Sequence, residues 1–245
     1  MPRILLQSAH ILHSRAYRDT SLIIDVLTEN YGRIALVARG ARRAKSQWQA
    51  LLQPFRKLLI SWSSKGDLGT LTSAEHDGEI VWLKGSSLIS GLYVNELIMR
   101  LMHRDDAHPQ LYVSYQCLLL SMYKISQHEA GTRFDVERVL RVFERDILRE
   151  FGYGLVLDHD VRSGDHIKPD CSYYYYPEEG PVETNAASTQ QSAVLIQGKS
   201  LISLQQGCLD DEASLREAKR LMRAMLNRVL GNKPLNSREL FRSNR

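Results

Sequence analysis

The first eighty residues alternate between short apolar runs and turn-forming clusters. In the cluster Glu29–Gly32, Asn30 and Gly32 supply the positive φ that a short hairpin loop requires. The pattern predicts five strands, at Ile4–His13, Ser21–Thr28, Arg33–Arg39, Phe55–Trp62 and Leu68–Glu75. Five short strands favour a small closed barrel, which leaves no sheet edge exposed.

Apolar residues further along the chain recur every three or four positions, as in helices that bury one face. Five helices are predicted, from Ser86 or Ser87, from near Pro109, and at Arg133–Phe151, Ser200–Gln206 and Glu212–Leu230. Between the third and fourth helices, residues 153–199 mix turn formers, acids and the tyrosine run Tyr173–Tyr176, which is typical of a strand and turn.

These patterns together predict an α+β protein of two domains. Residues 1–80 form a five-stranded barrel of the oligonucleotide/oligosaccharide-binding (OB-fold) type, and residues 81–245 form an α-helical bundle with residues 153–199 as an irregular insert. The composition agrees, since 43% hydrophobic and 24% charged residues are ordinary globular values.

Composition also narrows the cellular setting. No apolar run approaches the length needed to span a bilayer, and the first fifteen residues lack the pattern of a secretory signal. Three scattered cysteines are too few for a disulfide framework or a zinc site. We therefore expect a cytoplasmic protein without a membrane partner.

Positive charge is concentrated at the two ends of the chain. Residues 1–77 carry 11 Lys and Arg against 6 Asp and Glu, whereas residues 153–199 carry 3 against 7. The densest basic stretch is the connection between the third and fourth strands, with Arg39, Arg42, Arg43 and Lys45. Such a loop suits phosphate binding, which needs charge and reach.

The basic loop leaves two interpretations open. It is either a nucleic-acid contact or an ordinary solvated loop, and Trp48 behind it either stacks on a base or packs against the barrel. The third helix poses a similar choice, because Arg138, Arg141, Arg145 and Arg149 form a basic ridge. That ridge is a solvated charged face or a docking site for an acidic partner.

No pattern of catalytic residues stands out. The chain has no nucleophile elbow, phosphate-binding loop, dinucleotide motif or HExxH. A metal-site interpretation is suggested by six side chains of the insert, but their spacing matches no CxxC or HxxxH pattern; they are Asp158, His159, Asp160, Asp165, His166 and Cys171. We expect no catalytic residues, no metal and no cofactor, and hence not an enzyme.

Several segments, in order along nearly the whole chain, resemble the RecO family of bacterial recombination mediators. They are LHSRAYRDTSLIIDVLTENYGRIALVARGAR, ALLQPF, SGLYVNEL, FGYGL and GNKPLNSRELFR. The resemblance implies an N-terminal OB-fold, a helical bundle, and a role in DNA repair in the bacterial cytoplasm, associated with the nucleoid. It implies binding to single- and double-stranded DNA, strand annealing, binding to the acidic tail of single-stranded-DNA-binding protein (SSB), and indirect assistance to RecA, together with RecR. Many members carry four cysteines in the insert, where this chain has only Cys171, so a zinc-free module is expected.

The resemblance also assigns roles to residues. The positions implied for DNA contact lie in the barrel and are Arg33, Arg39, Arg42, Arg43, Lys45, Trp48, Arg56 and Lys57. Arg141 matches the position of an arginine that grips the SSB tail, flanked by Arg138 and Arg145, with Tyr93 and Leu97 as the apolar side of the pocket. Two other functions stay open, a metal-dependent nuclease using Asp158, Asp160 and Asp165, and an adaptor whose basic patches meet acidic proteins.

Overall fold

A computed structural model describes residues 3–64, 66, 68–128, 131–184, 193–231, 234–237 and 239–240. The chain divides into two compact units, one of residues 1–126 with 235–245 and the other of residues 127–234. Within the described residues, no helix is long and apolar enough to cross a membrane.

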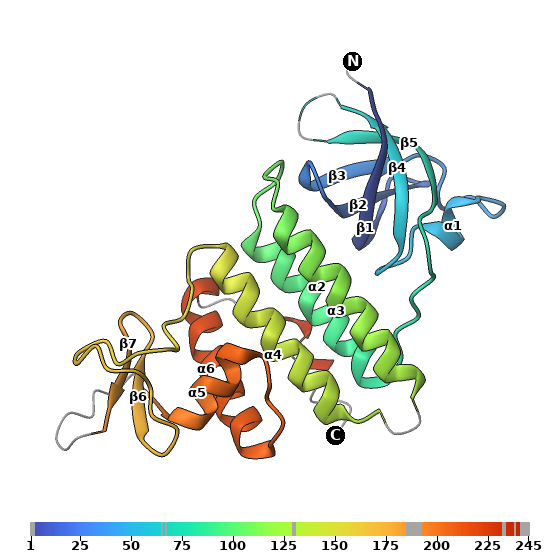
Figure 1. The fold of residues 1–245 in the computed structure, drawn as a ribbon. Helices are drawn as coiled ribbons and strands as arrows, with labels where there is room; N and C mark the ends of the chain where they lie inside the picture. The colour runs from blue at the N-terminus through green and yellow to red at the C-terminus, as the bar shows by residue number, and fades with distance from the viewer. Residues whose placement is uncertain are drawn as a thin grey trace. The chain divides into compact units, whose positions relative to one another are not determined.

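The first unit begins with a closed five-stranded barrel (Figure 1). Its strands are β1 (Arg3–Tyr17), β2 (Ser21–Thr28), β3 (Gly32–Ala38), β4 (Lys57–Ser63) and β5 (Gly69–His76). They follow the order β1-β2-β3-β5-β4, and β4 returns to pair with β1. Antiparallel pairing prevails except between β3 and β5, which meet in parallel at Leu36 and Gly69. The predicted OB-fold barrel is confirmed.

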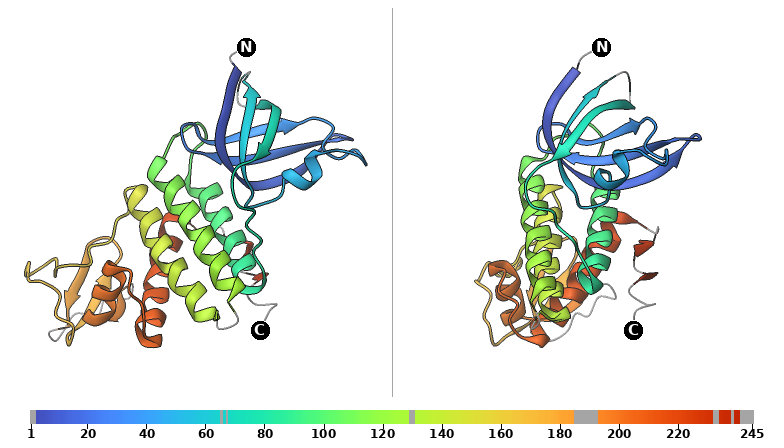
Figure 2. Two further views of the ribbon diagram at one scale, coloured as in Figure 1. Left: turned by 45° about the vertical axis from the view of Figure 1, so that its right-hand side comes forward. Right: turned by 90° about the vertical axis from the view of Figure 1, so that its right-hand side faces the viewer.

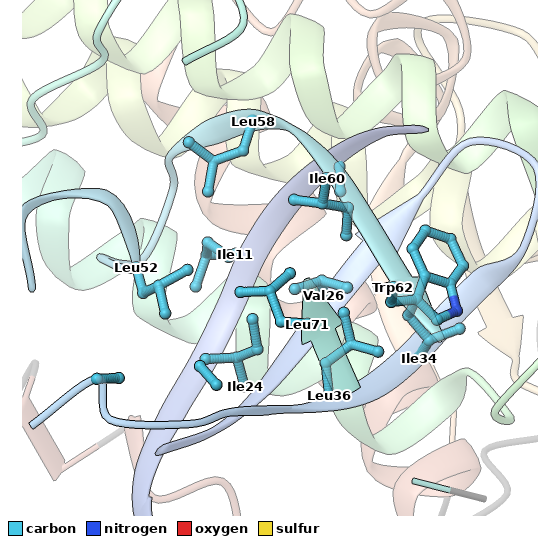
Figure 3. Close-up of a cluster of buried hydrophobic side chains, with 13 residues drawn as sticks. Ile11, Ile24, Val26, Ile34, Leu36, Leu52, Leu58, Ile60, Trp62 and Leu71 are labelled. Atoms are coloured by element: carbon cyan, nitrogen blue, oxygen red, sulfur yellow. The ribbon is translucent and has the colours of Figure 1, made fainter. Parts of the chain in front are cut away.

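The barrel closes around one apolar core (Figure 3). Alternate residues on β2 and β3, such as Ile24, Val26 and Leu36, point inward, as a period of two requires. A Cβ at Gly69 would lie 2.7 Å from the Leu36 side chain, so glycine permits the close β3–β5 approach.

Two helices of the first unit, α2 (Gly85–Leu101) and α3 (Pro109–Gln127), are tied to the barrel by buried polar contacts. The Asn95 side chain donates a hydrogen bond of 2.7 Å to the Leu12 carbonyl and accepts one of 2.6 Å from the Tyr115 hydroxyl. Asp25, on the outer face of β2, lies 3.8 Å from both Arg33 and Arg104. The compact unit therefore extends beyond residue 80 and includes the first two helices.

The second unit combines helices with a small sheet (Figure 1). Its helices are α4 (Arg133–Glu150), α5 (Gly198–Gln206) and α6 (Glu212–Leu230). The sheet has the order β7-β6-β8, with β6 (Ser172–Tyr176) between β7 (Gly180–Glu183) and β8 (Val194–Gln197). The predicted strand in the tyrosine run is therefore present, and Tyr173 and Tyr175 are buried in it.

Candidate nucleic-acid interface

The basic loop between β3 and the short helix α1 (Trp48–Leu51) is an ordered turn on the barrel surface. Gly40 has a φ of 70°, which lets the chain reverse, and the side chain of Ala41 is buried in the barrel core. This anchor explains the small residues within the basic stretch. The side chains of Arg39, Arg43 and Lys45 remain exposed.

Arg42 ties the loop to the turn between β1 and β2. Its backbone N–H donates to the Thr20 carbonyl at 2.8 Å, and its guanidinium donates to the carbonyls of Arg18 and Asp19 at 3.2 and 3.4 Å. The β1–β2 turn therefore lies beside the basic loop. Arg18 is exposed in that turn, and Arg15 is exposed on the last part of β1.

The two loops and the adjoining end of β1 form what we call the basic patch, which contains Arg15, Arg18, Arg39, Arg42, Arg43 and Lys45. Among the described residues, no carboxylate lies within salt-bridge distance of these six side chains. Asp19 lies in the same turn and is exposed. Cations without protein counter-charges attract a polyanion.

Arg15 and Arg18 lie outside the set of residues that the sequence predicts for DNA contact. Both lie more than twenty residues before the basic loop, and each is an isolated arginine in a strand or turn with no local charge run. The pairing of β2 with β3, which places Leu22 opposite Ala38, and the hydrogen bonds from Arg42 bring the two segments together. The order of the strands could nevertheless have indicated this neighbour. Because β1, β2 and β3 are consecutive antiparallel strands, the β1–β2 turn and the end of β3 lie at the same end of the barrel.

Trp48 is half-buried and packs against the barrel core. Of the two interpretations left open by the sequence, the structure therefore supports packing. Its role as a DNA contact remains a prediction.

The other predicted DNA contacts in the barrel lie outside the basic patch. Arg33 faces Asp25, and burial lowers the pKa of its guanidinium. Lys57 lies 3.3 Å from Asp77. Arg56 is buried beneath the ring of Trp82, with its guanidinium carbon 4.0 Å from the ring centroid.

The arginines of α4 are engaged within the second unit. Arg138 pairs with Asp210 at 2.8 Å, and Arg141 pairs with the fully buried Glu144 at 3.0 Å. Arg145 donates two hydrogen bonds of 2.7 Å to the last carbonyls of α5, at Leu204 and Gln205. Such bonds satisfy the free carbonyls of a helix end.

The residues predicted for the SSB tail are placed in different surroundings. Arg141 is 6% exposed and lies in the second unit, whereas Tyr93 and Leu97 are buried in α2 of the first unit. The charges of Arg138, Arg141 and Arg145 are compensated locally, as the interpretation as a solvated charged face expects, but Arg141 is buried and not solvated. Their role toward a tail remains a prediction.

The acidic residues of the insert serve its local fold. Asp160 is buried and accepts hydrogen bonds from the backbone N–H groups of Arg162, Ser163 and Glu183 at 2.6 to 2.9 Å. These bonds help to lower the pKa of its carboxyl group, against the effect of burial, which acts in the opposite direction. In the part of the chain described by the structure, no three metal-ligating side chains gather into a candidate site.

Comparisons with known proteins cover nearly the whole chain. The family model described as Recombination protein O N terminal matches residues 1–77, and the one described as Recombination protein O C terminal matches residues 84–239. A DNA repair protein RecO of Coxiella burnetii is 42% identical over 239 residues, which is 98% of each chain. The DNA repair protein RecO of Nitrosococcus oceani is 43% identical over 98% of this chain and 93% of the relative.

Proposed function

The chain belongs to the RecO family of DNA repair proteins, and on that premise we propose that it binds single- and double-stranded DNA through the basic patch and anneals complementary strands. The observation that carries the proposal is the joining of two cationic loops by Arg42 at one place on the barrel. OB-fold barrels commonly bind oligonucleotides beside the connection between their first two strands.

Annealing follows from the same charges. Two complementary strands repel each other through their phosphates, and a cationic surface lowers that repulsion while condensed counterions are released. No covalent bond has to form or break, so the proposed activity is that of a mediator and requires no catalytic residues.

Binding should depend steeply on salt, and the basic patch should account for much of that dependence. The variant with Arg39, Arg43 and Lys45 replaced by Ala keeps Arg42, and therefore keeps the hydrogen bonds that fix the loop. We expect the slope of log K against log salt to become shallower by about 2 to 3 for duplex DNA, since each phosphate contact contributes about 0.9. Fluorescence anisotropy of a labelled duplex over a salt series measures this slope.

A matched control removes the same charge elsewhere. Arg149, Arg216 and Arg223 are exposed on α4 and α6, and their replacement by Ala changes the net charge equally. This control should keep a slope within about 1 of the wild type. Equal flattening in both variants would mean that DNA responds to total charge, and the basic patch would lose its assignment.

A second part of the proposal concerns protein partners. The family resemblance supports binding to the acidic, apolar-ended SSB tail and cooperation with RecR in loading RecA. Arg141 is the proposed contact for the tail carboxylate, because a guanidinium binds a carboxylate through two parallel hydrogen bonds. To do so it would have to exchange or share its contact with Glu144.

A further inference from the structure

The linker between β5 and α2 exposes a tryptophan. Trp82 keeps 58% of its surface exposed, whereas Trp62 is buried in the barrel core and Trp48 packs against it. In both views of Figure 2 the linker runs from the barrel to the start of α2 within the first unit. The exposed indole of Trp82 therefore presents a flat aromatic surface on which a ligand can stack.

The indole rests on a buried cation. The guanidinium carbon of Arg56 lies 4.0 Å from the ring centroid of Trp82, and Arg56 is only 5% exposed. Within the described residues, its Nη1 has no hydrogen-bond partner and no carboxylate lies within salt-bridge distance. Burial lowers the pKa of this guanidinium.

This geometry leaves one face of the indole available. The guanidinium covers one face at van der Waals distance, so the exposed surface of Trp82 must come mainly from its other face and its edges. The cation–π contact also holds the ring in one orientation, which reduces the entropy that a ligand would lose by ordering it.

The surrounding charge favours an anionic ligand. A buried guanidinium without a counter-charge is costly, and a nearby phosphate would compensate it. The neighbouring Lys57 is already neutralised by Asp77, so Arg56 carries the uncompensated charge. An apolar protein segment stacked on Trp82 would leave this charge unbalanced.

We propose that Trp82 is a stacking site for an unpaired base of a DNA strand, with Arg56 bracing the indole from below. The inference rests on the proposed DNA-binding function and extends it to a contact that distinguishes single strands from duplexes. A duplex keeps its bases stacked on one another, so only an unpaired base has a free face for the indole. Arg56 thereby gains a role as a positioning residue.

The test compares three ligands of equal length, about 16 nucleotides, the upper site size of one OB-fold. They are oligothymidine, the same sugar–phosphate chain without bases, and a blunt duplex. We expect Trp82→Ala to weaken oligothymidine binding roughly 5- to 150-fold, as the loss of one stacked base predicts, and to change the other two affinities by less than about twofold. Leu88→Ala removes another exposed apolar side chain, on α2, and should leave all three affinities unchanged.

Trp82→Phe guards against a folding defect, because phenylalanine keeps an aromatic face over Arg56. It should retain single-strand binding within about tenfold of the wild type. Oligothymidine should quench tryptophan emission in the wild type, and this quenching should fall by more than half in Trp82→Phe.

Unchanged oligothymidine affinity in Trp82→Ala, equal losses for all three ligands, or unchanged quenching in Trp82→Phe would each overturn the stacking site. A protein that binds no DNA would overturn the proposed function as well. If the basic-patch variant flattens the salt slope as expected but Trp82→Ala leaves oligothymidine affinity unchanged, only the stacking site is overturned. The two proposals separate in this way because the ratio of single-strand to duplex affinity is measured independently of the salt slope.

Discussion

His10 lies on β1 between the rings of Tyr112 and Tyr115, whose centroids are 5.3 and 5.2 Å from its own. It is 3% exposed. Burial lowers the pKa of His10 to about 3, and the positive charge of Lys57 adds to this effect. The negative charge of Asp77 acts in the opposite direction. The barrel therefore keeps this imidazole neutral at the surface that meets α3.

Acid should weaken the first unit through this residue. The unfolded chain binds a proton at His10 near pH 6.5, and the folded chain does so only near pH 3, so the stability present above pH 6.5 is lost as the pH falls toward 3. Between pH 7 and pH 4.5 the free energy of unfolding should fall in both proteins. We expect the fall to be about 2 to 3 kcal/mol smaller in His10→Phe than in the wild type. Urea unfolding at both pH values measures the difference.

His13, exposed on the same strand, provides the control. His13→Phe should keep the wild-type pH dependence. If His10→Phe also keeps the wild-type pH dependence, proton binding at His10 contributes nothing to the acid sensitivity of the first unit, and this prediction is wrong.

At the scale of the element, α4 begins with a capping box. The Thr132 hydroxyl accepts a hydrogen bond from the Asp135 N–H at 3.3 Å, and the Asp135 carboxylate accepts one from the Thr132 N–H at 3.0 Å. These bonds satisfy two of the four N–H groups that a helix start leaves free, and they lower the pKa of Asp135.

Thr132→Ala should lower the free energy of unfolding by about 1 kcal/mol, because the N–H of Asp135 loses its acceptor. Denaturant unfolding monitored by circular dichroism should show a lower midpoint with an unchanged slope. Thr132→Ser keeps the hydroxyl and should lose less than about half as much. Equal losses in both variants would assign the effect to the threonine methyl group instead of the cap.

The ridge on α4 shows how an element acquires its role from its partners. The spacing of Arg138, Arg141 and Arg145 was compatible with a docking face, but Asp210, Glu144 and the end of α5 occupy their guanidinium groups. Arg141→Ala would leave Glu144 buried without this cation, at a cost of roughly 3 to 5 kcal/mol. A loss of tail binding in that variant therefore needs a stability measurement beside it.

For the whole molecule, the proposed function combines DNA binding with recognition of SSB. We expect the protein to accelerate annealing of complementary oligonucleotides coated with SSB, and to lose that acceleration when SSB lacks its last residues. The basic patch should still promote annealing of bare strands, since counterion release needs no tail. Gel or fluorescence-transfer kinetics with intact and truncated SSB separate the two contributions.

Each result of that experiment has a distinct meaning. Acceleration that survives truncation of SSB would keep the DNA role and remove the tail interaction with Arg141. Failure to accelerate annealing of bare strands at low salt would contradict the mediator function and favour an adaptor.

The sequence by itself determined most of the elements and their order, but it did not predict the short helix α1 or the strands β7 and β8. The predicted strands and helices appear within a few residues of their expected bounds, except that β1 extends to Tyr17. Periods of two and of 3.6 are local properties, and so are caps such as Asp211 at α6. The barrel followed as well, because five short strands need closure.

Only the tertiary structure decided which of the chemically similar residues face solvent. Trp48 and Trp82 both lie in connections outside the predicted strands, yet one packs on the core and the other lies exposed over Arg56. Arg18 joined the basic patch through the hydrogen bonds that Arg42, more than twenty residues away, donates to the carbonyls of Arg18 and Asp19. Burial and charge compensation depend on contacts between distant segments, and no local pattern records those contacts.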